Sequence, residues 1–132
     1  MKNLILIFLF CFSLGSAQVV QLIDSNTKEP VNFERINTLP VGAVVDGVIY
    51  AKKGAYLYKR IYTENVRLEW FGADPTGLKS SNLAFIKAID FLKRNKGGKL
   101  LLMGKYRVTE PLIFDNLEGI SIVGDSNGND VI

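Results

Sequence analysis

The sequence contains no histidine and only one cysteine, Cys11, among its 132 residues. The absence of histidine excludes Ser-His-Asp and Cys-His nucleophile arrangements and nearly all zinc chemistry. Cys11 lies within an apolar run near the start of the chain, where it acts as one more hydrophobic residue. Once that segment is removed, no disulfide, thiol nucleophile or thiolate metal site is available, so stability has to come from packing.

A strong charge of one sign is also lacking. The chain has 16 Lys and Arg against 13 Asp and Glu, which gives a formal net charge of +3. Proteins that bind nucleic acids carry a basic face on which Lys and Arg cluster. A charge this small does not predict such a face, and we expect no nucleic-acid partner.

The first 17 residues have the pattern of a secretory signal. One basic residue, Lys2, precedes an unbroken apolar run at 4–12, and small residues follow up to Ala17. A membrane anchor is the alternative, but a spanning helix needs about 20 apolar residues and this run is shorter. We predict a signal peptide at 1–17 with cleavage after Ala17, a secreted or periplasmic protein, and no membrane contact after cleavage.

The segment that follows residue 81 has the period of an amphipathic helix. Ser80 or Ser81 can accept a hydrogen bond from a first-turn N–H, and Gly97 can take the left-handed conformation that ends a helix. Between them, apolar residues recur three to four positions apart, with charged residues on the other side. We expect the buried face to contain Leu83, Ile86, Ile89 and Leu92, widened by Phe85, Ala88 and Phe91.

After Gly97-Gly98 the period changes from helix to strand. Leu100, Leu101 and Leu102 form an apolar run that is too short for a helix and predicts a strand covered on both faces. A similar apolar run that ends in glycine recurs twenty positions later. Between the two runs we expect short strands at 106–108 and 112–114. The echoed residues are Leu100, Leu102, Met103 and Gly104, followed by Ile120, Ile122, Val123 and Gly124.

The order of these elements resembles the start of the pectate lyase superfamily, over about half of the chain. The motifs that carry the resemblance are Trp70-Phe71-Gly72-Ala73, Asp74-Pro75-Thr76-Gly77, Ala88-Ile89-Asp90, Gly97-Gly98 with its strand, Gly104-Lys105-Tyr106, Pro111-Leu112 and 120–124. The family usually has an acidic Gly-Asp-Gly turn where Asp74-Pro75 stands here, and this departure concerns the subfamily, not the architecture.

The resemblance implies a short capping helix that leads into a right-handed parallel β-helix. It also implies a parent protein that acts on polysaccharide. Members of this group typically carry their reactive residues on coils in the middle of the solenoid, and this chain contains little more than one coil. The chain therefore inherits no catalytic position. We expect it to be a truncated gene product or the amino-terminal piece of a longer protein, whose remaining coils would be its partners.

The part of the chain before this region has weaker signals. Residues 18–40 read as an extended lead-in, because polar residues at 24–28 and the prolines Pro30 and Pro40 interrupt any regular element. Residues 44–62 contain two β-rich runs joined at Lys53-Gly54, which predicts a hairpin. We therefore divide the chain into the signal peptide, a lead-in with a hairpin at 18–65, and the capping helix with the first coil at 66–132; the predicted fold class is mainly β.

Aromatic and basic side chains gather in and after the hairpin. A row of aromatic rings can stack on sugar rings, but such residues are also common in strands, so we favour packing roles for them. The basic side chains could contact an anionic polysaccharide, but a charged rim is usually only solvated, and we favour that interpretation. These residues are Tyr50, Tyr56, Tyr58, Tyr62 and Trp70, and Lys52, Lys53, Lys59 and Arg60.

The acidic residues form no pattern that predicts catalysis. Glycan cleavage needs two carboxylates across a bond, or a base with a charge neutraliser, and no spacing here suggests either. Asp74 suits a β-turn, and residues 125–130 superficially resemble a calcium loop but lack its central glycine and distal Glu. We predict no catalytic, cofactor-binding or metal-binding residue in this chain.

Three functions are compatible with these patterns. The first is the structural amino-terminal part of a secreted polysaccharide lyase or glycoside hydrolase with a β-helix fold. The second is a non-catalytic β-helix, such as an adhesin or a tail-spike-like stalk that binds glycans. The third is a small secreted αβ domain without repeats, in which the hairpin and the helix pack together.

Overall fold

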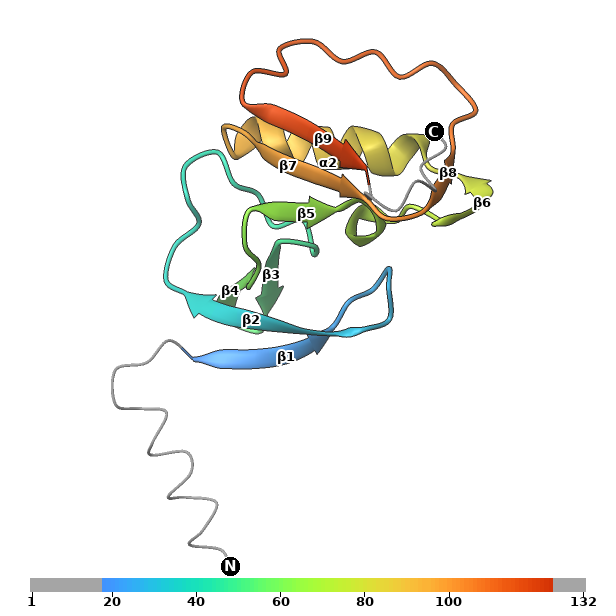
Figure 1. Cartoon of the computed structure of the whole chain (residues 1–132). Coiled ribbons are helices and arrows are strands. Elements are labelled where there is room, and N and C mark those ends of the chain that lie inside the picture. Colours follow the sequence, from blue (N-terminus) through green and yellow to red (C-terminus); the bar gives the residue numbers. More distant parts are fainter. Residues whose placement is uncertain (1–17, 125–132) are drawn as a thin grey trace, which may run out of the picture.

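The computed structural model describes residues 18–124, and this part of the chain is mainly β (Figure 1). An antiparallel sheet forms one layer, and two parallel sheets with a helix form the other. No helix in the described range is long and apolar enough to cross a membrane. The elements are β1 (Val19–Ile23), β2 (Pro30–Ile36), β3 (Tyr50–Lys53), β4 (Tyr56–Arg60), β5 (Asn65–Arg67), η1 (Leu68–Phe71), β6 (Thr76–Ser80), α2 (Asn82–Arg94), β7 (Gly98–Leu102), β8 (Lys105–Arg107) and β9 (Ile120–Gly124).

The predicted hairpin is present as β3 and β4, but its first arm is shorter than expected. The loop between the two strands is Gly54-Ala55, in which Gly54 has a φ of +61°. Residues 44–49 form no strand, and the chain bends at 47–49. The cause is Asp46, whose Oδ1 accepts hydrogen bonds from the backbone N–H groups of Val48, Ile49 and Tyr50 at 2.8 to 2.9 Å. Such a side-chain acceptor competes with strand pairing for the same donors.

The expectation of an irregular lead-in is wrong. Strands β1 and β2 form an antiparallel hairpin, and the sheet order is β1-β2-β4-β3. The polar run at 24–28 is the turn of this hairpin, because Asp24 Oδ1 accepts the backbone N–H groups of Asn26 and Thr27 at 2.8 and 2.9 Å. Pro30 is tolerated since it is the first residue of β2.

Strands β5, β7 and β9 form a parallel sheet in that order, as the repeat predicted for β7 and β9. The register differs from the sequence echo, because Leu100 pairs with Ile122 and not with Ile120. The offset between the two strands is thus 22 residues, not 20. The difference is even, so the same side chains still point inward. Val66, Leu100 and Ile122 stand on successive strands and form an inward aliphatic ladder.

A second, two-stranded parallel sheet pairs β6 with β8. The structure thus contains β6, which the sequence reading missed, but residues 112–114 form no strand. At the corner between β7 and β8, Gly104 stacks on the corner that precedes β6, and an added Cβ would lie 2.7 Å from the Cβ and carbonyl oxygen of Pro75. At the other end of β7, the N–H of Gly98 donates to the carbonyl oxygen of Gly119 at 2.9 Å.

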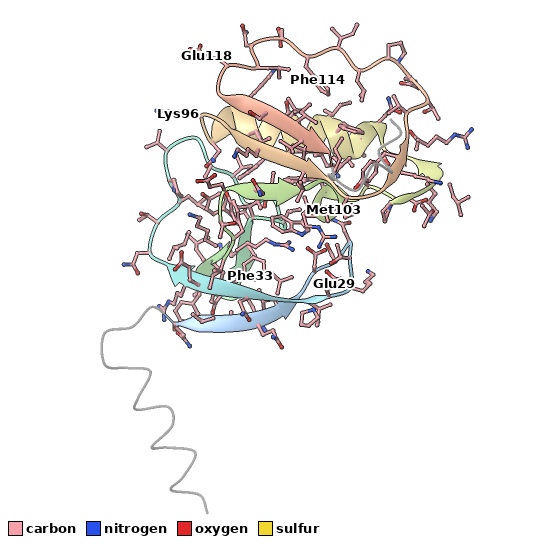
Figure 2. The ribbon with its side chains drawn as sticks, viewed as in Figure 1. Glu29, Phe33, Lys96, Met103, Phe114 and Glu118 are labelled. Atoms are coloured by element: carbon pink, nitrogen blue, oxygen red, sulfur yellow. The ribbon has the colours of Figure 1, made fainter. Side chains whose placement is uncertain are left out.

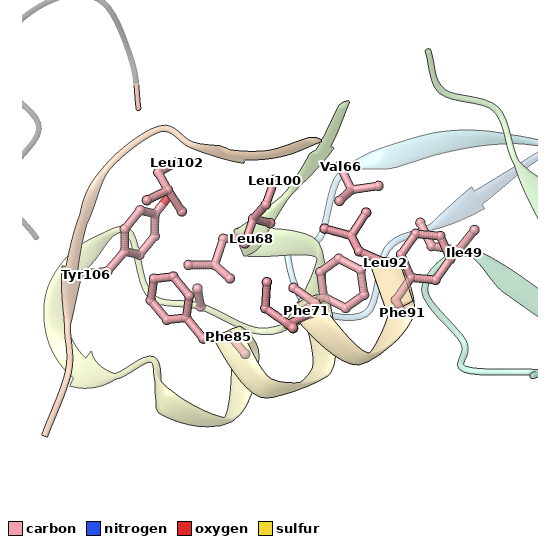
Figure 3. Packing of buried hydrophobic residues seen from close by; sticks show 14 of the residues in the cluster. Ile49, Val66, Leu68, Phe71, Phe85, Phe91, Leu92, Leu100, Leu102 and Tyr106 are labelled. Carbon is pink, nitrogen blue, oxygen red and sulfur yellow. The ribbon is translucent and has the colours of Figure 1, made fainter. Parts of the chain in front are cut away.

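Helix α2 packs its apolar side into the main core (Figure 3). The buried face is rotated from the predicted one, because Leu83 is 62% exposed and Ile86 is 46% exposed. At 100° per residue these two positions lie beyond one edge of the buried arc. The residues on that arc are Ala84, Phe85, Ala88, Ile89, Phe91 and Leu92.

The ends of α2 also differ in detail from the prediction. Ser81 occupies the N-cap position, but its hydroxyl makes no capping hydrogen bond. Ser80 Oγ instead accepts the N–H of Asn82 at 3.4 Å. At the other end, Lys96 takes the left-handed helical conformation with a φ of 60°, and Gly97 follows with a φ of 117°. Gly97 is needed both for this positive φ and for space, since an added Cβ would lie 2.6 Å from the carbonyl oxygen of Gly119.

Within residues 18–124, the stack of parallel strands ends at β9. Ile122 points toward the same side as the fully buried Leu100, yet it is 43% exposed. The edge of β9 that faces away from β7 pairs with no other described strand. An inward-pointing aliphatic side chain at an unpaired edge marks a place where the interior is incomplete.

Candidate functional site

A groove runs between the tip of the β1–β2 hairpin and the parallel layer formed by β5 and η1. It consists of two adjoining hollows of about 450 and 270 Å³ that share Glu29 and Arg67. We call these the large hollow and the small hollow. Figure 2 shows Glu29 on the hairpin side of the space between the two layers. The large hollow is lined mainly by Asn32, Arg60, Tyr62, Asn65, Trp70 and Leu101, and the small one by Asn26, Thr27, Glu69, Ala73 and Pro75.

The two sides of the groove are tied together by Asn26. Its Nδ2 donates to the carbonyl oxygen of Trp70 at 2.6 Å, across 44 residues of sequence. Gly72 ends η1 in the left-handed region with a φ of 100°, and Asn26 lies against it, with Oδ1 3.5 Å from the position of an added Cβ. The hairpin tip therefore has a fixed position beside η1.

A buried ion pair supports the large hollow. Arg60 donates to Asp24 at 2.5 Å, and the two side chains are almost fully buried. Burial opposes ionisation of Asp24, but the N–H groups of Thr27 and Asn26 together with Arg60 outweigh it and lower the pKa of the carboxyl. Burial lowers the pKa of Arg60 as well, yet an arginine stays charged at any pH at which proteins fold.

The same guanidinium lies over Trp70. Its carbon is 3.7 Å from the centroid of the ring, a cation–π contact. Tyr62 contacts the indole edge to face, with ring centroids 5.9 Å apart. One face of Trp70 is therefore covered by Arg60, and the aromatic pair forms an apolar wall of the large hollow.

The small hollow contains a carboxylate with one free oxygen. Glu69 is only 6% exposed, and its Oε1 accepts a hydrogen bond from the hydroxyl of Tyr106. Tyr106 in turn accepts the N–H of Met103 at 3.0 Å. Burial, followed by the bond to Glu69, raises the pKa of Tyr106 well above its usual range. The tyrosine is thus a fixed proton donor that orients Glu69.

The second oxygen of Glu69 faces Arg67. Glu69 Oε2 and Arg67 Nε are 3.5 Å apart, but neither atom makes a hydrogen bond with another described group. A pair of this kind can bind a group that both donates and accepts a hydrogen bond. It does not by itself provide two carboxylates on either side of a scissile bond.

The predicted packing roles of the aromatic residues are confirmed in part. Tyr50 and Tyr58 are buried, and the guanidinium of Arg35 lies over the ring of Tyr56 at 3.7 Å. Tyr62 and Trp70 contact each other but also line the groove.

The predicted solvation of the basic residues is also confirmed only in part. Lys52 and Lys53 are exposed as expected, and Lys59 is half-buried. The prediction of a solvated side chain is wrong for Arg60, because its pairing with Asp24 places it in the interior.

Asp74 is a turn residue, as predicted. The N–H of Gly77 donates to its carbonyl oxygen at 3.2 Å, and its carboxylate accepts the N–H of Thr76 and of Lys79 at 2.9 Å each. These bonds, with one from the Thr76 hydroxyl as the largest contribution, lower the pKa of Asp74 to about 2. No group of three or more metal-binding side chains occurs among residues 18–124. The signal at 1–17 and the loop at 125–130 lie outside the described residues.

The sequence reading missed Asn26, Arg67 and Glu69 as parts of a site. The sequence does contain one signal for this site. Arg67, Glu69 and Trp70 are three large polar or aromatic side chains within a span of four residues. Comparison of the chain with protein-family models, with curated proteins and with solved structures found no match.

Proposed function

We propose that this chain is the amino-terminal capping region of a secreted parallel β-helix protein that acts on polysaccharide, as the resemblance to the pectate lyase superfamily implies. The observation that carries this proposal is the inward ladder of Val66, Leu100 and Ile122 on three parallel strands. Stacked aliphatic side chains on successive parallel strands are how a solenoid buries an interior that no single coil can bury.

The connections between the strands support the same proposal. The chain passes from β5 through β6 and α2 to β7, and then through β8 to β9, so two parallel sheets are built coil by coil. Crossover connections between parallel strands are right-handed in nearly all proteins, and a right-handed coil is therefore the expected one. Helix α2 occupies the place of one wall in the first coil and supplies much of the core.

The open edge at β9 supports further coils as the partner. The strand contains no charged residue and no proline, although exposed edges are usually protected by such residues. A following coil with an aliphatic side chain beside Ile122 would complete the interior. In this proposal the chain is structural, the catalytic residues lie on later coils, and the signal peptide at 1–17 directs export.

The test uses the full-length protein and pectin-type polymers. The expected result is release of unsaturated sugars by a lyase or of reducing sugars by a hydrolase. Absence of both products, with binding of the polymer retained, would reject the enzyme and leave the second function.

That second function is a non-catalytic β-helix that binds glycans, such as an adhesin or a stalk. The groove favours it in one respect, because it combines an aromatic wall with hydrogen-bonding groups. The sequence of further coils would separate the two functions. Asp, Arg or Lys aligned on successive coils favour the enzyme, and long Ser, Asn and Thr loops favour the stalk.

A further inference from the structure

We propose that the small hollow is a subsite for a hydroxyl group of a neutral sugar ring, held between Glu69 and Arg67. This inference rests on the proposed polysaccharide binding and names the chemistry of the ligand. It assigns a binding role to the chain itself, in addition to its structural one.

The charges around the hollow select a neutral ligand. Glu69 and Glu29 both line it, so an anionic group would be repelled by two carboxylates. Arg67 also lines it, with Nε 3.5 Å from Glu69 Oε2, and places a guanidinium donor beside the carboxylate. A hydroxyl is compatible with both signs, because it donates to a carboxylate and accepts from a guanidinium at the same time.

The hydrogen-bonding geometry fits this chemistry. Tyr106 occupies Glu69 Oε1 and leaves Oε2 as a buried acceptor that faces Arg67 but makes no hydrogen bond. Arg67 Nε, at 3.5 Å, is a donor in the same condition. When the Arg67 side chain moves aside, a hydroxyl can enter, donate to Oε2 and accept from the guanidinium. Buried polar groups normally have partners, so a ligand that satisfies these two has a specific advantage.

Access of a sugar hydroxyl to Glu69 depends on the position of the Arg67 side chain. Glu69 is held by Tyr106, whereas the Arg67 side chain is 38% exposed at the junction of the two hollows. Rotation of this side chain opens Glu69 Oε2 to the small hollow, and the guanidinium then closes over the ligand.

The size of the groove suits a short sugar chain. A volume of about 270 Å³ far exceeds the roughly 30 Å³ that one water occupies in the liquid. It also lies just below the range of about 300 to 1,000 Å³ that is usual for small-molecule pockets. One ring fits the small hollow, and a neighbouring ring reaches the apolar wall of Tyr62 and Trp70 in the large hollow.

The test uses Trp70, the only tryptophan in the chain, as an internal reporter. The purified protein is titrated with xylotriose, cellotriose, trigalacturonate and CaCl₂, and binding is followed by calorimetry and by Trp70 fluorescence. We expect a saturable change in both signals with at least one neutral trisaccharide. Trigalacturonate and calcium should bind at least tenfold more weakly.

Two variants and one control locate the site. Glu69→Gln puts an amide donor where the acceptor is needed, and Arg67→Gln removes the guanidinium from a partly exposed position. Each should weaken binding of the neutral sugar at least tenfold. Glu118→Gln makes the same change on an exposed side chain, which Figure 2 shows far from Glu29, and should leave binding unchanged. If Glu69→Gln does not fold, the affinity of Arg67→Gln for the neutral sugar tests the site on its own.

Several outcomes would overturn the inference. They are absence of binding by both neutral sugars, preference for trigalacturonate or calcium, heat of binding without a response of Trp70, and unchanged affinity in the folded variants. These results are separable from the polymer assay. Polymer cleavage without trisaccharide binding rejects the subsite alone, whereas trisaccharide binding without cleavage rejects the enzyme and retains the subsite.

Discussion

At the scale of single residues, the most consequential contact is the ion pair of Asp24 and Arg60. A surface ion pair contributes little, but a buried one is costly to break because the remaining charge has no solvent. Asp24 also fixes the turn between β1 and β2 through two backbone N–H groups. One carboxylate therefore joins the hairpin turn to β4 and, through Arg60, to Trp70.

Replacement of that carboxylate should strongly destabilise the protein. Asp24→Asn keeps an acceptor for the turn but leaves the buried Arg60 without a counter-charge, and we expect a loss of about 3 to 5 kcal/mol in the free energy of unfolding. Urea denaturation measures the difference. The matched control is Asp115→Asn, which breaks an exposed pair with Lys93 and should leave the free energy of unfolding nearly unchanged. Equal losses in the two variants would show that Arg60 is not desolvated.

Asp74 predicts a pH dependence. Its pKa is about 2 in the folded protein against a reference value of 3.8, so the folded state favours the charged form. The resulting stabilisation is complete above the reference pKa and is lost as the pH falls from about 4 to about 2. Asp74→Asn should therefore flatten the dependence of the thermal midpoint on pH in this window. A variant whose acid-induced loss matches that of the wild type would contradict the assignment.

Glycine at position 97 is required by the close approach of two chain segments. Gly97→Ala introduces a Cβ 2.6 Å from the carbonyl oxygen of Gly119 at a φ of +117°, and we expect it to prevent formation of the β7–β9 pair. Gly47→Ala is the matched control, because Gly47 also has a positive φ but no atom within 4 Å of an added Cβ. It should cost about 1 to 2 kcal/mol, the usual strain of a left-handed residue. Amide hydrogen exchange of β7 distinguishes the two.

At the scale of elements, the central segments were predictable and the peripheral ones were not. The period of α2 and the apolar run of β7 are determined locally, and both elements are present. The hairpin of β1 and β2 was missed because the polar run at 24–28 and Pro30 were interpreted as interruptions, although Asp24 uses that run to form the turn. The rotation of the buried arc of α2 was also unpredictable, since the sequence shows an apolar stripe but not which edge of it contacts the sheet.

This rotation leads to a prediction for α2. Leu83→Ala should change the free energy of unfolding by no more than about 0.5 kcal/mol, because the side chain is mainly exposed. Leu92→Ala removes a side chain that is 1% exposed and contacts the core, and should cost about 2 to 5 kcal/mol. The two variants have the same change in composition within one helix, so chemical denaturation compares them directly. Similar losses would favour the face predicted from the sequence.

The groove was less predictable than the fold. Trp70 and Tyr62 were recognised as aromatic residues that could contact a sugar, but their partners come from three separate elements. Asn26 reaches η1 only because the hairpin folds back on it. Glu69 has a free oxygen only because Tyr106, 37 residues later, occupies the other. Neither relation has a local sequence signal.

At the scale of the whole molecule, the edge of β9 that pairs with no described strand predicts self-association. Ile122 and Val123 are partly exposed on a strand without charges, and such edges pair with other chains. Residues 18–132 expressed alone should therefore be unstable or should self-associate, as measured by analytical ultracentrifugation. A monomer that unfolds in one cooperative transition would contradict the open-ended solenoid.

A charge at this edge should prevent the association. Ile122→Lys places an ammonium group at the open interior and should shift the sedimentation profile toward monomer. Ile113→Lys introduces the same charge at a residue that is 90% exposed but outside any strand, and should have no effect. Equal suppression by the two variants would indicate a general effect of net charge.

The buried Asp24 also has a consequence for synthesis of the protein. The β1–β2 hairpin leaves the ribosome early, but its aspartate lacks a counter-ion until Arg60, 36 residues later, has been translated. Strand β2 likewise acquires its second neighbour, β4, only then. The amino-terminal layer therefore forms only after β4 has been synthesised, and the hairpin is not fully stabilised before then.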